Sequence, residues 1–361
     1  MADILVAVSG NIPVDIQDQV QSGKRPRPDY FVFASALPAD ILDYSRMRRE
    51  GTFLTRLFEK VGGANAALAW ECFKRRQKYA LLFTDGEQVG IPLAFFLKFL
   101  GRGKHHVKHA MIVHILSTRK KMIILDLLGI QSAIDLFLVY SSFQKEFILQ
   151  RWGIKKNKVS WIPFQADGQF FQPSAQNEKK KNDSRFMICS AGLEFRDYPT
   201  MMAAVDGLDV EVVLAAASPW SKRSDTTTLR TIPNNVTVKR FSLFELRELY
   251  DLAAFVVVPL YPVNFQAGVT TIMEAMAMGK AVIVTKTPGQ TDYVQEGITG
   301  LYVPPGDILA LRTAMQKLLQ DRPEAERMGR LSKEKFERDF NLDRYVELIK
   351  IKLDGLLQDP S

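Results

Sequence analysis

The four histidines of the chain all lie in one stretch of ten residues, within GKHHVKHAMIVH: His105, His106, His109 and His114. Imidazole side chains can bind metal ions or move protons near neutral pH. A metal ion held by the first three would lie against the ammonium groups of Lys104 and Lys108, with no carboxylate nearby. We therefore expect no metal site here and interpret these three histidines as part of a basic surface.

A second set of residues suited to chemistry lies between Val256 and Gly279, in VVVPLYPVNFQAGVTTIMEAMAMG. A loop of small residues around Gly268 leads into a predicted helix that Thr270 or Thr271 caps. The N-terminus of a helix presents N–H groups and a positive dipole end to a phosphate. Glu274, early in that helix, can accept hydrogen bonds from paired sugar hydroxyls. The alternative is that Glu274 is only a favourable surface charge at a helix start.

The scaffold for these residues is predicted from short apolar runs that alternate with helical patterns. We expect strands at 3–9, 30–37, 79–85, 110–115, 136–142, 159–164, 186–192, 210–217, 236–241, 254–260 and 281–286. Helices are expected at 46–60, 64–77, 88–101, 117–129, 143–152, 197–206, 243–251 and 271–279, and after 306, with a polar linker at 172–183. Apolar strands joined through helices predict parallel sheets covered on both faces. Ligands of such sheets bind at the carboxyl ends of the strands, and His114 falls at one such end.

Length and composition favour a globular protein of two domains. The chain has 361 residues, of which 47% are hydrophobic and 24% charged. Its start, MADILVAVSG, lacks the pattern of a secretory signal, and its apolar runs fall short of the roughly 20 residues that cross a bilayer. The isolated Cys72 and Cys189 favour a reducing compartment. We expect a cytoplasmic protein, with the cytoplasmic face of the membrane as an alternative.

The net charge of +8 is concentrated in one region. The window 71–121 contains eleven Lys and Arg against three acidic residues, which equals the excess of the whole chain. The window is either a solvated basic face or a surface that attracts something anionic. We expect no nucleic-acid binding, because no nucleic-acid module is recognisable. The segment PLAFFLKFLGRGKHH (92–106) predicts peripheral contact with an anionic membrane, and a buried helix with a charged end is the equal alternative.

The helix that contains Glu274 carries a resemblance to a known family. EAMAMGKAVIVT is similar to the donor-binding motif of retaining GT-B glycosyltransferases of family 4, the glycosyl transferases group 1. That motif reads Glu, seven residues, Glu, then Ala-x-Ala-x-Gly-x-Pro-Val, and Ala281 replaces the proline. The resemblance implies that Glu274 binds the nucleotide ribose. Gln266 stands at the first acidic position, which contacts the donor sugar in the family.

Further segments match the family in order, well over 136–340 and loosely over 1–135. ICSAGLEFRDYPTMMAAV (188–205) resembles the segment whose basic pair grips the diphosphate. Gly192 stands at the first basic position and Arg196 at the second, so one cation is missing or is supplied elsewhere, for example by Lys286. FSLFELRELYDLAAFVVVP (241–259), which begins at Phe241, resembles the segment that meets the nucleobase. VSWIPFQADGQFFQP (159–173) resembles the crossing between the two domains.

The resemblance implies a GT-B fold, with two Rossmann-like parallel-sheet domains facing a cleft and a C-terminal helix packed back on the first domain. It places an acceptor-binding domain at 1–170, a donor-binding domain at 171–340 and the returning helix at 341–361. The implied activity is hexosyl transfer with retention from a UDP- or GDP-linked sugar, without a metal or other cofactor. The acceptor is an unidentified glycan, lipid-linked or small molecule.

The implied site residues fall into two groups. Those with catalytic roles are Arg196, His114 and Gln266. Those that bind the donor are Glu274, Gly268, Val269, Thr270, Thr271, Gly10, Gly192 and Phe241. Because the leaving phosphate helps to deprotonate the acceptor in retaining members, no separate base is assigned. The departures at Gln266 and Gly192 leave one main alternative, an inactive GT-B protein that binds a sugar nucleotide or a partner.

Overall fold

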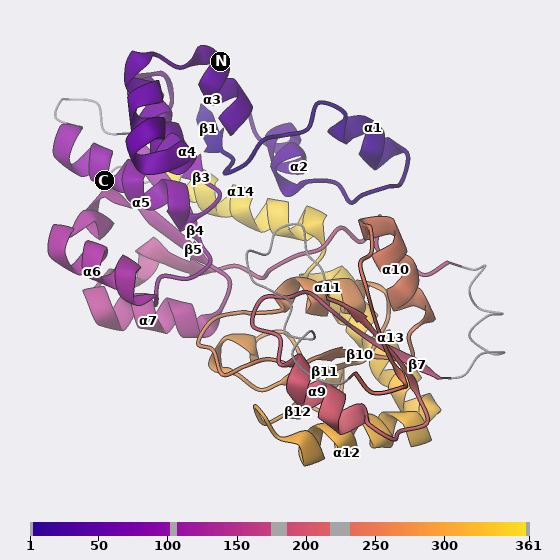
Figure 1. Cartoon of the computed structure of the whole chain (residues 1–361). Coiled ribbons are helices and arrows are strands. Elements are labelled where there is room, and N and C mark those ends of the chain that lie inside the picture. The colour runs from indigo at the N-terminus through magenta and orange to yellow at the C-terminus, as the bar shows by residue number, and fades with distance from the viewer. Residues whose placement is uncertain (1–2, 102–106, 175–185, 217–231, 359–361) are drawn as a thin grey trace. The chain divides into compact units, whose positions relative to one another are not determined.

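The computed structural model describes residues 3–101, 107–174, 186–216 and 232–358, and the chain divides into two compact units (Figure 1). Unit 1 comprises Met1–Asp18, Arg27–Ile162 and Tyr345–Ser361, and unit 2 comprises Gln19–Pro26 and Pro163–Arg344. Within the described residues each unit has a six-stranded sheet whose neighbouring strands are parallel. The prediction of two parallel α/β units in tandem is therefore confirmed.

The first half of the chain forms the sheet of unit 1, in the order β2-β1-β3-β4-β5-β6. Its elements are β1 (Ile4–Ala7), α1 (Ile16–Gln21), α2 (Asp29–Ala36), β2 (Ala39–Leu42), α3 (Tyr44–Glu50), α4 (Phe53–Arg75), η1 (Arg76–Lys78), β3 (Leu81–Thr84), α5 (Glu87–Leu100), β4 (Lys108–Val113), α6 (Arg119–Leu128), η2 (Ile130–Ala133), β5 (Leu136–Val139), α7 (Ser142–Trp152), η3 (Lys156–Lys158) and β6 (Val159–Trp161).

The second half of the chain forms the sheet of unit 2, in the order β12-β11-β10-β7-β8-β9. The elements in this half of the chain are β7 (Met187–Ala191), α9 (Tyr198–Val205), β8 (Glu211–Ala215), β9 (Val236–Lys239), α10 (Leu243–Leu252), β10 (Val256–Val258), α11 (Val269–Ala277), β11 (Val282–Thr285), η6 (Pro288–Gln290), β12 (Gly300–Val303), α12 (Ile308–Gln320), α13 (Arg322–Asp339) and α14 (Leu342–Gln358).

Each sheet has a point where the order of its strands reverses. In unit 2 the first strand, β7, lies between β8 and β10, so the next connections run to opposite sides. In unit 1 the corresponding strand is β1, which lies between β2 and β3. The connections on the two sides of such a point leave a crevice at the carboxyl ends of the strands, where doubly wound proteins bind ligands. The topology therefore directs attention to the loops after β7 and β10 and after β1 and β3.

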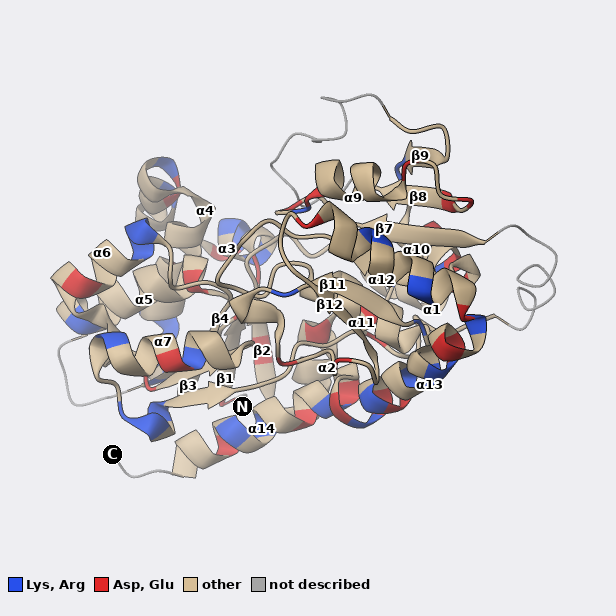
Figure 2. Cartoon of the chain, turned by 90° about the horizontal axis from the view of Figure 1, so that it is seen from below, with Lys and Arg blue, Asp and Glu red and all other residues tan. Residues whose placement is uncertain are grey.

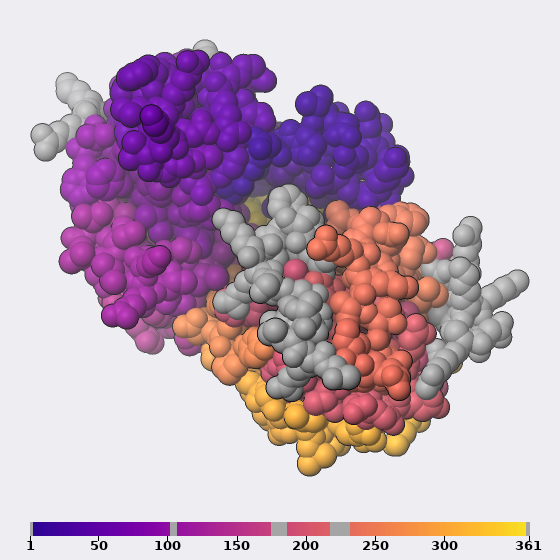
Figure 3. Space-filling model, viewed as in Figure 1, coloured from indigo at the N-terminus to yellow at the C-terminus, as the bar shows by residue number. Residues whose placement is uncertain are grey.

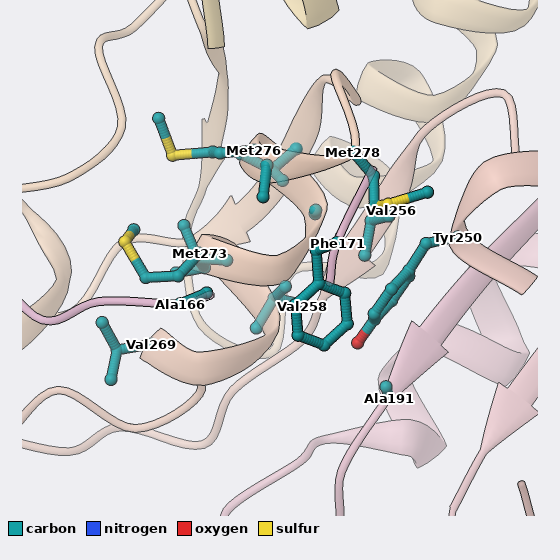
Figure 4. Packing of buried hydrophobic residues seen from close by; sticks show 14 of the residues in the cluster. Ala166, Phe171, Ala191, Tyr250, Val256, Val258, Val269, Met273, Met276 and Met278 are labelled. Atoms are coloured by element: carbon teal, nitrogen blue, oxygen red, sulfur yellow. The ribbon is translucent and has the colours of Figure 1, made fainter. Parts of the chain in front are cut away.

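The strands of unit 2 are buried on both faces. Val256 and Val258 of β10 belong to one core cluster and Val257 to the other, as the alternation of side chains along a strand requires. The first cluster includes α11, and the second includes α9 and α12. Figure 4 shows part of the first cluster, in which Tyr250 lies beside Phe171, with a ring separation of 6.4 Å.

The final helix, α14, completes unit 1, as predicted. Tyr345 forms a hydrogen bond of 2.8 Å with Tyr140, which follows β5. Val346, Ile349 and Leu353 are also buried, at the spacing of one helix face. Figure 1 shows the yellow α14 beside the indigo and purple elements of unit 1.

Three details of the predicted secondary structure were wrong. Residues 30–37 form helix α2 instead of a strand, and the edge strand is the following β2. A short aromatic run does not distinguish helix from strand by periodicity alone. The helices predicted at 46–60 and 64–77 are α3 and a longer α4, which kinks at Gly63 (φ 77°). Strand β12 was missed because its sequence, GLYV, begins with glycine and is followed by two prolines. The predicted linker lies outside the described residues from 175 onward.

One close approach in unit 2, between helix α13 and the turn that follows α11, gives a test of the packing. A Cβ atom on Gly329 of α13 would lie 2.2 Å from the carbonyl oxygen of Gly279, whereas one on Gly355 of α14 would meet nothing within 4 Å. We expect Gly329→Ala to lower the free energy of unfolding by about 2–3 kcal/mol, because backbone must move. Gly355→Ala should raise it by about 0.5–1 kcal/mol, since alanine favours a helix interior. Urea unfolding measures both, and equal stability of the two variants would contradict the close approach.

Candidate active site

The guanidinium of Arg196 is the best-defined polar group at the reversal point of unit 2. Arg196 lies in the loop after β7 and is only 5% exposed. Its Nε donates to the carbonyl of Ala191 at 2.8 Å, and its Nη1 donates to that of Glu194 at 3.0 Å. Its Nη2 donates to Oγ1 of Thr271 in the first turn of α11, also at 3.0 Å. The side chain therefore joins the end of β7 to the start of the helix that follows β10.

Two glycines leave the space that this guanidinium occupies. Gly192 (φ 92°) and Gly268 (φ 78°) both have backbone conformations that side chains rarely adopt. A Cβ atom on Gly192 would lie 2.7 Å from Nη2 of Arg196, and one on Gly268 would lie 3.1 Å from Nη1. The glycine at position 192, where the family resemblance predicts a cation, thus has a local cause. The side chain of Arg196 fills the position that a second side chain would need.

The start of helix α11 adds a second source of positive potential. The predicted cap at Thr270 or Thr271 was wrong: the helix begins two residues earlier than expected, its N-cap is Gly268, and Val269, Thr270 and Thr271 form the first turn. The first amides of a helix have no acceptor within the helix and bear part of its dipole. Burial lowers the pKa of Arg196, yet that pKa starts so far above neutrality that the group stays charged. A buried cation and a helix N-terminus at one point suit an anion such as a diphosphate.

Glu274 lies further along the same helix and is buried. Its carboxylate accepts a hydrogen bond of 2.8 Å from the hydroxyl of Tyr250 on α10. Burial raises the pKa of Glu274 to about 7, although the bond from Tyr250 and the charge of Arg196 both oppose that rise. The carboxylate is therefore poorly solvated in this structure, and hydroxyl donors of a ligand would stabilise its charged form.

The remaining predicted residues of unit 2 lie in the loops at the same end of the sheet. Gln266 is buried in the loop between β10 and α11, and its carbonyl accepts a weak bond from the N–H of Val269 at 3.4 Å. Phe241 follows β9 and is half-buried against the core cluster that contains Tyr250. Lys286, the suggested substitute cation, is exposed at the end of β11. The structure thus joins Arg196 to Thr271 by a hydrogen bond and places the guanidinium where side chains on Gly192 and Gly268 would collide with it, and the charge of Arg196 acts on Glu274.

Unit 1 has its own polar group at its reversal point. Asp85, after β3, accepts two hydrogen bonds at Oδ2 from Ser9, which follows β1: one from the N–H at 2.7 Å and one from the hydroxyl at 2.9 Å. Its other oxygen, Oδ1, is buried and has no hydrogen-bond partner among the described residues. Burial raises the pKa of Asp85 to about 6, although the two hydrogen bonds from Ser9 lower it. Asp85 can therefore bind a hydroxyl group of a ligand.

His114 belongs to this second group of residues. It follows β4, and its Nε2 donates to the carbonyl of Asp85 at 3.1 Å. The N–H groups of His114 and Ile115 donate to the carboxylate of Glu87, which also forms an ion pair of 2.6 Å with Lys121. Burial alone would raise the pKa of Glu87, but His114 and Lys121 hold it below its ordinary value. Glu87 therefore fixes the loop that carries His114.

The interpretation of the other histidines needs correction. His109 is wholly buried in β4, so it is not part of a basic surface. Its Nδ1 lies 3.4 Å from the carbonyl of Ala133 and its Nε2 lies 3.3 Å from the hydroxyl of Thr84. Burial lowers the pKa of His109 to about 4, so the ring is neutral at pH 7. His105 and His106 lie outside the described residues.

Gly10, predicted to bind the donor, lies in the loop after β1. Its N–H donates to the carbonyl of Val8 at 2.9 Å, and its carbonyl accepts from the N–H of Tyr44. A Cβ atom at this position would meet nothing within 4 Å. The loop is therefore open, but the N–H group of Gly10 is already used within it.

Sequence reasoning missed Tyr250, Ser9, Asp85 and Glu87. Asp85 ends the predicted strand 79–85, so the rule that ligands bind at the carboxyl ends of strands could have identified it. Tyr250 gave no signal, because a tyrosine within a helical apolar pattern is most simply a core residue.

Comparisons with known proteins bear on the family and the fold of the chain. Residues 195–321 match the family described as glycosyl transferases group 1, a segment that begins beside Arg196 and includes Gln266 and Glu274. No curated protein sequence matches the chain significantly.

Solved structures share the architecture over nearly the whole chain. Sucrose-phosphate synthase from Thermosynechococcus elongatus is 19% identical, with a TM-score of 0.71 and 98% of each chain covered. HepE from Anabaena, solved in complex with UDP-glucose, is 14% identical, with a TM-score of 0.72, and 98% of this chain and 100% of that one are covered. An E. coli trehalose-6-phosphate protein bound to UDP-2-fluoro glucose is 10% identical, with a TM-score of 0.70 and 99% of each chain covered. The chain has the two-domain Rossmann-like GT-B fold.

Whether Arg196 leaves no room for a side chain at position 192 can be tested by comparing two glycines with positive φ, Gly192 and Gly207. A Cβ atom on Gly207 (φ 69°) would meet nothing within 4 Å, unlike one on Gly192. Gly207→Ala should therefore lower the free energy of unfolding by about 1 kcal/mol, from backbone strain alone. Gly192→Ala adds a collision with the guanidinium and should lower it by about 2–4 kcal/mol in all. Thermal or urea unfolding compares them, and equal losses would show that Arg196 does not occupy that space.

The burial of Glu274 predicts a pH dependence of stability. The folded protein holds this proton up to about pH 7, whereas an unfolded glutamate releases it near pH 4.5. The free energy of unfolding should therefore fall by about 3 kcal/mol between these two pKa values and then level off. Urea unfolding of Glu274→Gln across this range should lack that decrease. Substitution of the exposed Glu334 by Gln is the matched control, and its free energy of unfolding should change with pH as that of the unsubstituted protein does. If the free energy of unfolding of Glu274→Gln showed the same decrease with pH, Glu274 would not be the group with the raised pKa.

Proposed function

We propose that this protein is a glycosyltransferase that moves a sugar from a nucleotide-diphosphate sugar to an acceptor, with retention of anomeric configuration. The observation that carries the proposal is the buried guanidinium of Arg196 at the start of α11. It stands at the reversal point of a Rossmann-like sheet, where such folds bind nucleotides. The match of residues 195–321 to the glycosyl transferases group 1 supports the same conclusion.

Unit 2 is proposed to bind the donor. The diphosphate would accept hydrogen bonds from Arg196 and from the amides of Val269, Thr270 and Thr271, and Glu274 would accept those of the ribose hydroxyls. Gln266 would meet the sugar and Phe241 the base. Of the two nucleotides considered, UDP is supported by similar structures that were solved with UDP-glucose and UDP-2-fluoro glucose.

The chemistry proposed for this site follows from where charge develops. The bond between the anomeric carbon and the phosphate oxygen breaks, so negative charge grows on the diphosphate. Fixed positive groups in a site that excludes water stabilise such charge strongly. Arg196 and the dipole of α11 are suited to this role, and the proposal assigns it to them without a metal ion.

Unit 1 is proposed to bind the acceptor. The acceptor oxygen bonds to the anomeric carbon on the face that the phosphate leaves, and its proton passes to the departing phosphate oxygen. Asp85 and His114 supply a carboxylate oxygen and a half-buried imidazole at the ends of β3 and β4, and both groups can bind sugar hydroxyls. His114 would thus position the acceptor or the transferred sugar.

The cysteines support a reducing compartment. Cys72 and Cys189 are both buried free thiols, and they lie in different units. Neither takes part in a disulfide, which fits a protein of the cytoplasm. We propose a cytoplasmic location on that basis.

The proposal is tested by incubating the purified protein with a panel of UDP- and GDP-sugars and measuring the release of UDP or GDP. The protein should release nucleotide from one of these donors. Arg196→Lys should do so about 100-fold more slowly or worse, because the ammonium group of lysine cannot replace the three hydrogen bonds of the guanidinium. The exposed Arg330→Lys on α13 is the control and should retain full activity. Thermal unfolding verifies that both variants are folded.

Two results would contradict the proposal. Release of nucleotide at the same rate by Arg196→Lys would remove Arg196 from the site. Tight binding of UDP or GDP without any turnover would instead support the inactive alternative, a GT-B protein that binds a sugar nucleotide.

A further inference from the structure

We propose that unit 1 binds anionic lipid membranes through one surface formed by α4, α5 and α6. This surface, called the α4–α6 face below, consists of α4 from Phe53 to Val61, α5 from Phe95 to Leu100, and the exposed side of α6. Figure 3 shows this part of the chain in purple to magenta on the surface of the molecule. The inference goes beyond the proposed transferase activity and does not depend on it.

Exposed apolar side chains are concentrated on this face. Of the 21 large hydrophobic residues that the described part of the chain exposes, eleven lie on these three helix segments. The most exposed are Phe53 (77%), Val61 (80%) and Leu127 (79%). Scattered apolar residues are ordinary on a protein surface, but a contiguous group beside polar residues marks a site of interaction.

Helix α4 has the amphipathic pattern of a helix that lies on a membrane. Phe53, Leu57 and Val61 are spaced by four residues and form one exposed row. Arg56 and Lys60 are exposed in an adjacent row with the same spacing. The kink at Gly63 separates this part of the helix from the buried part, which packs on the sheet. A row of apolar side chains beside a row of cations can insert the first row between lipids and place the second among headgroups.

Helix α6 repeats this arrangement along its length. Arg119 and Lys120 are exposed in its first turn. Ile123 and Leu127 follow Arg119 at intervals of four residues, as Ile124 and Leu128 follow Lys120, and all four are exposed. The helix thus has cations at its beginning and apolar side chains over its later turns.

Helix α5 connects the other two helices into one surface. Phe96 of α5 packs against Phe58 of α4, with their ring centroids 5.2 Å apart. The Nζ of Lys98 donates to the carbonyls of Leu128 and Gly129 at the end of α6, at 2.9 and 2.7 Å. Between these contacts the exposed rings of Phe95 and Phe99 lie 4.9 Å apart. The three segments are therefore neighbours within unit 1.

The charges on the face favour an anionic partner. Its two acidic residues are neutralised by cations from other helices: Glu59 pairs with Arg48, and Asp126 pairs with Arg151. Arg56, Lys60, Arg119 and Lys120 form no ion pair with any described residue. Figure 2 colours the Lys and Arg of these helices blue. The face is thus both apolar and positively charged, which matches the surface of an anionic bilayer.

A second copy of the chain fits this face less well. A two-fold interface places the same patch on both partners, so the cations of α4 and α6 would lie against the same cations of the second copy. Like charges brought together in an interface cost affinity. No helix within the described ranges combines the length and apolar character that crossing a bilayer requires, so the contact proposed is peripheral.

The structure also revises which residues of the basic window 71–121 belong to such a face. Lys74 and Arg75 pair with the buried Glu71, and Lys121 pairs with Glu87. Those three cations serve the fold of unit 1. Arg56 and Lys60, which lie outside the window, belong to the face instead.

The test is co-sedimentation of the full chain with vesicles of phosphatidylcholine alone or mixed with phosphatidylglycerol, at low and high salt. We expect binding to the anionic vesicles only, and weaker binding at high salt, because salt screens exposed charges. The triple variant Arg56→Gln/Lys60→Gln/Lys120→Gln should bind roughly 100-fold more weakly, at about fivefold for each cation. Val61→Ser/Leu127→Ser should lose about as much through apolar contact, roughly tenfold for each side chain.

Matched controls come from unit 2. Leu309 is 73% exposed on α12, and Arg330 is exposed on α13. Leu309→Ser/Arg330→Gln should bind as the unsubstituted protein does. A polarity-sensitive label on Val61→Cys reports insertion, because both native cysteines are buried. Its emission should shift to the blue on adding anionic vesicles, whereas the same label on Leu309→Cys should not shift.

Three results would overturn the proposal. One is no sedimentation with anionic vesicles at low salt. Another is an equal loss of binding in the control variant and the face variants. The third is a self-associated protein in light scattering that becomes monomeric in Val61→Ser/Leu127→Ser, which would assign the face to a second copy of the chain.

Discussion

The arrangement of unit 2 depends on one desolvated cation. Removing a guanidinium from water is costly, and the structure compensates by giving Arg196 three acceptors, two of them backbone carbonyls. The space for it exists only because positions 192 and 268 are glycines with positive φ. The same contacts hold the end of β7 to the start of α11. A group that anchors the local fold thus also directs positive charge to the point where a doubly wound sheet leaves a crevice.

The buried acid on the same helix is the counterpart of that cation. The hydrogen bond from Tyr250 and the charge of Arg196 both lower the pKa of Glu274, yet burial keeps that pKa near 7. A site with a poorly solvated cation and a poorly solvated carboxyl gains from any ligand that supplies an anion and hydroxyl donors together. A nucleoside diphosphate offers both, which is why the proposed donor fits this unit better than a simple phosphate would.

Unit 1 applies the same topological rule with different chemistry. Its reversal point is spanned by the bonds from Ser9 to Asp85, and Glu87 holds the adjacent loop that carries His114. The group there is a carboxylate whose second oxygen is buried and has no hydrogen-bond partner among the described residues. The two units therefore present opposite polarity at equivalent places, a cation in unit 2 and an acid in unit 1. This difference suits a donor with a diphosphate and an acceptor with hydroxyls.

The sequence by itself determined the class of fold and proposed candidate site residues in unit 2. Alternating apolar runs predicted parallel sheets. Loop and helix-start signals, which lie within a few residues of each other, pointed to Gly268 and Glu274, and the family resemblance added Arg196. Only the tertiary structure decided what depends on distant partners. It buried His109 inside β4, brought Ser9 to Asp85 across 76 positions, and showed that Arg196 occupies the space above Gly192. Such contacts are set by packing between elements, and local periodicity contains no information about which elements meet.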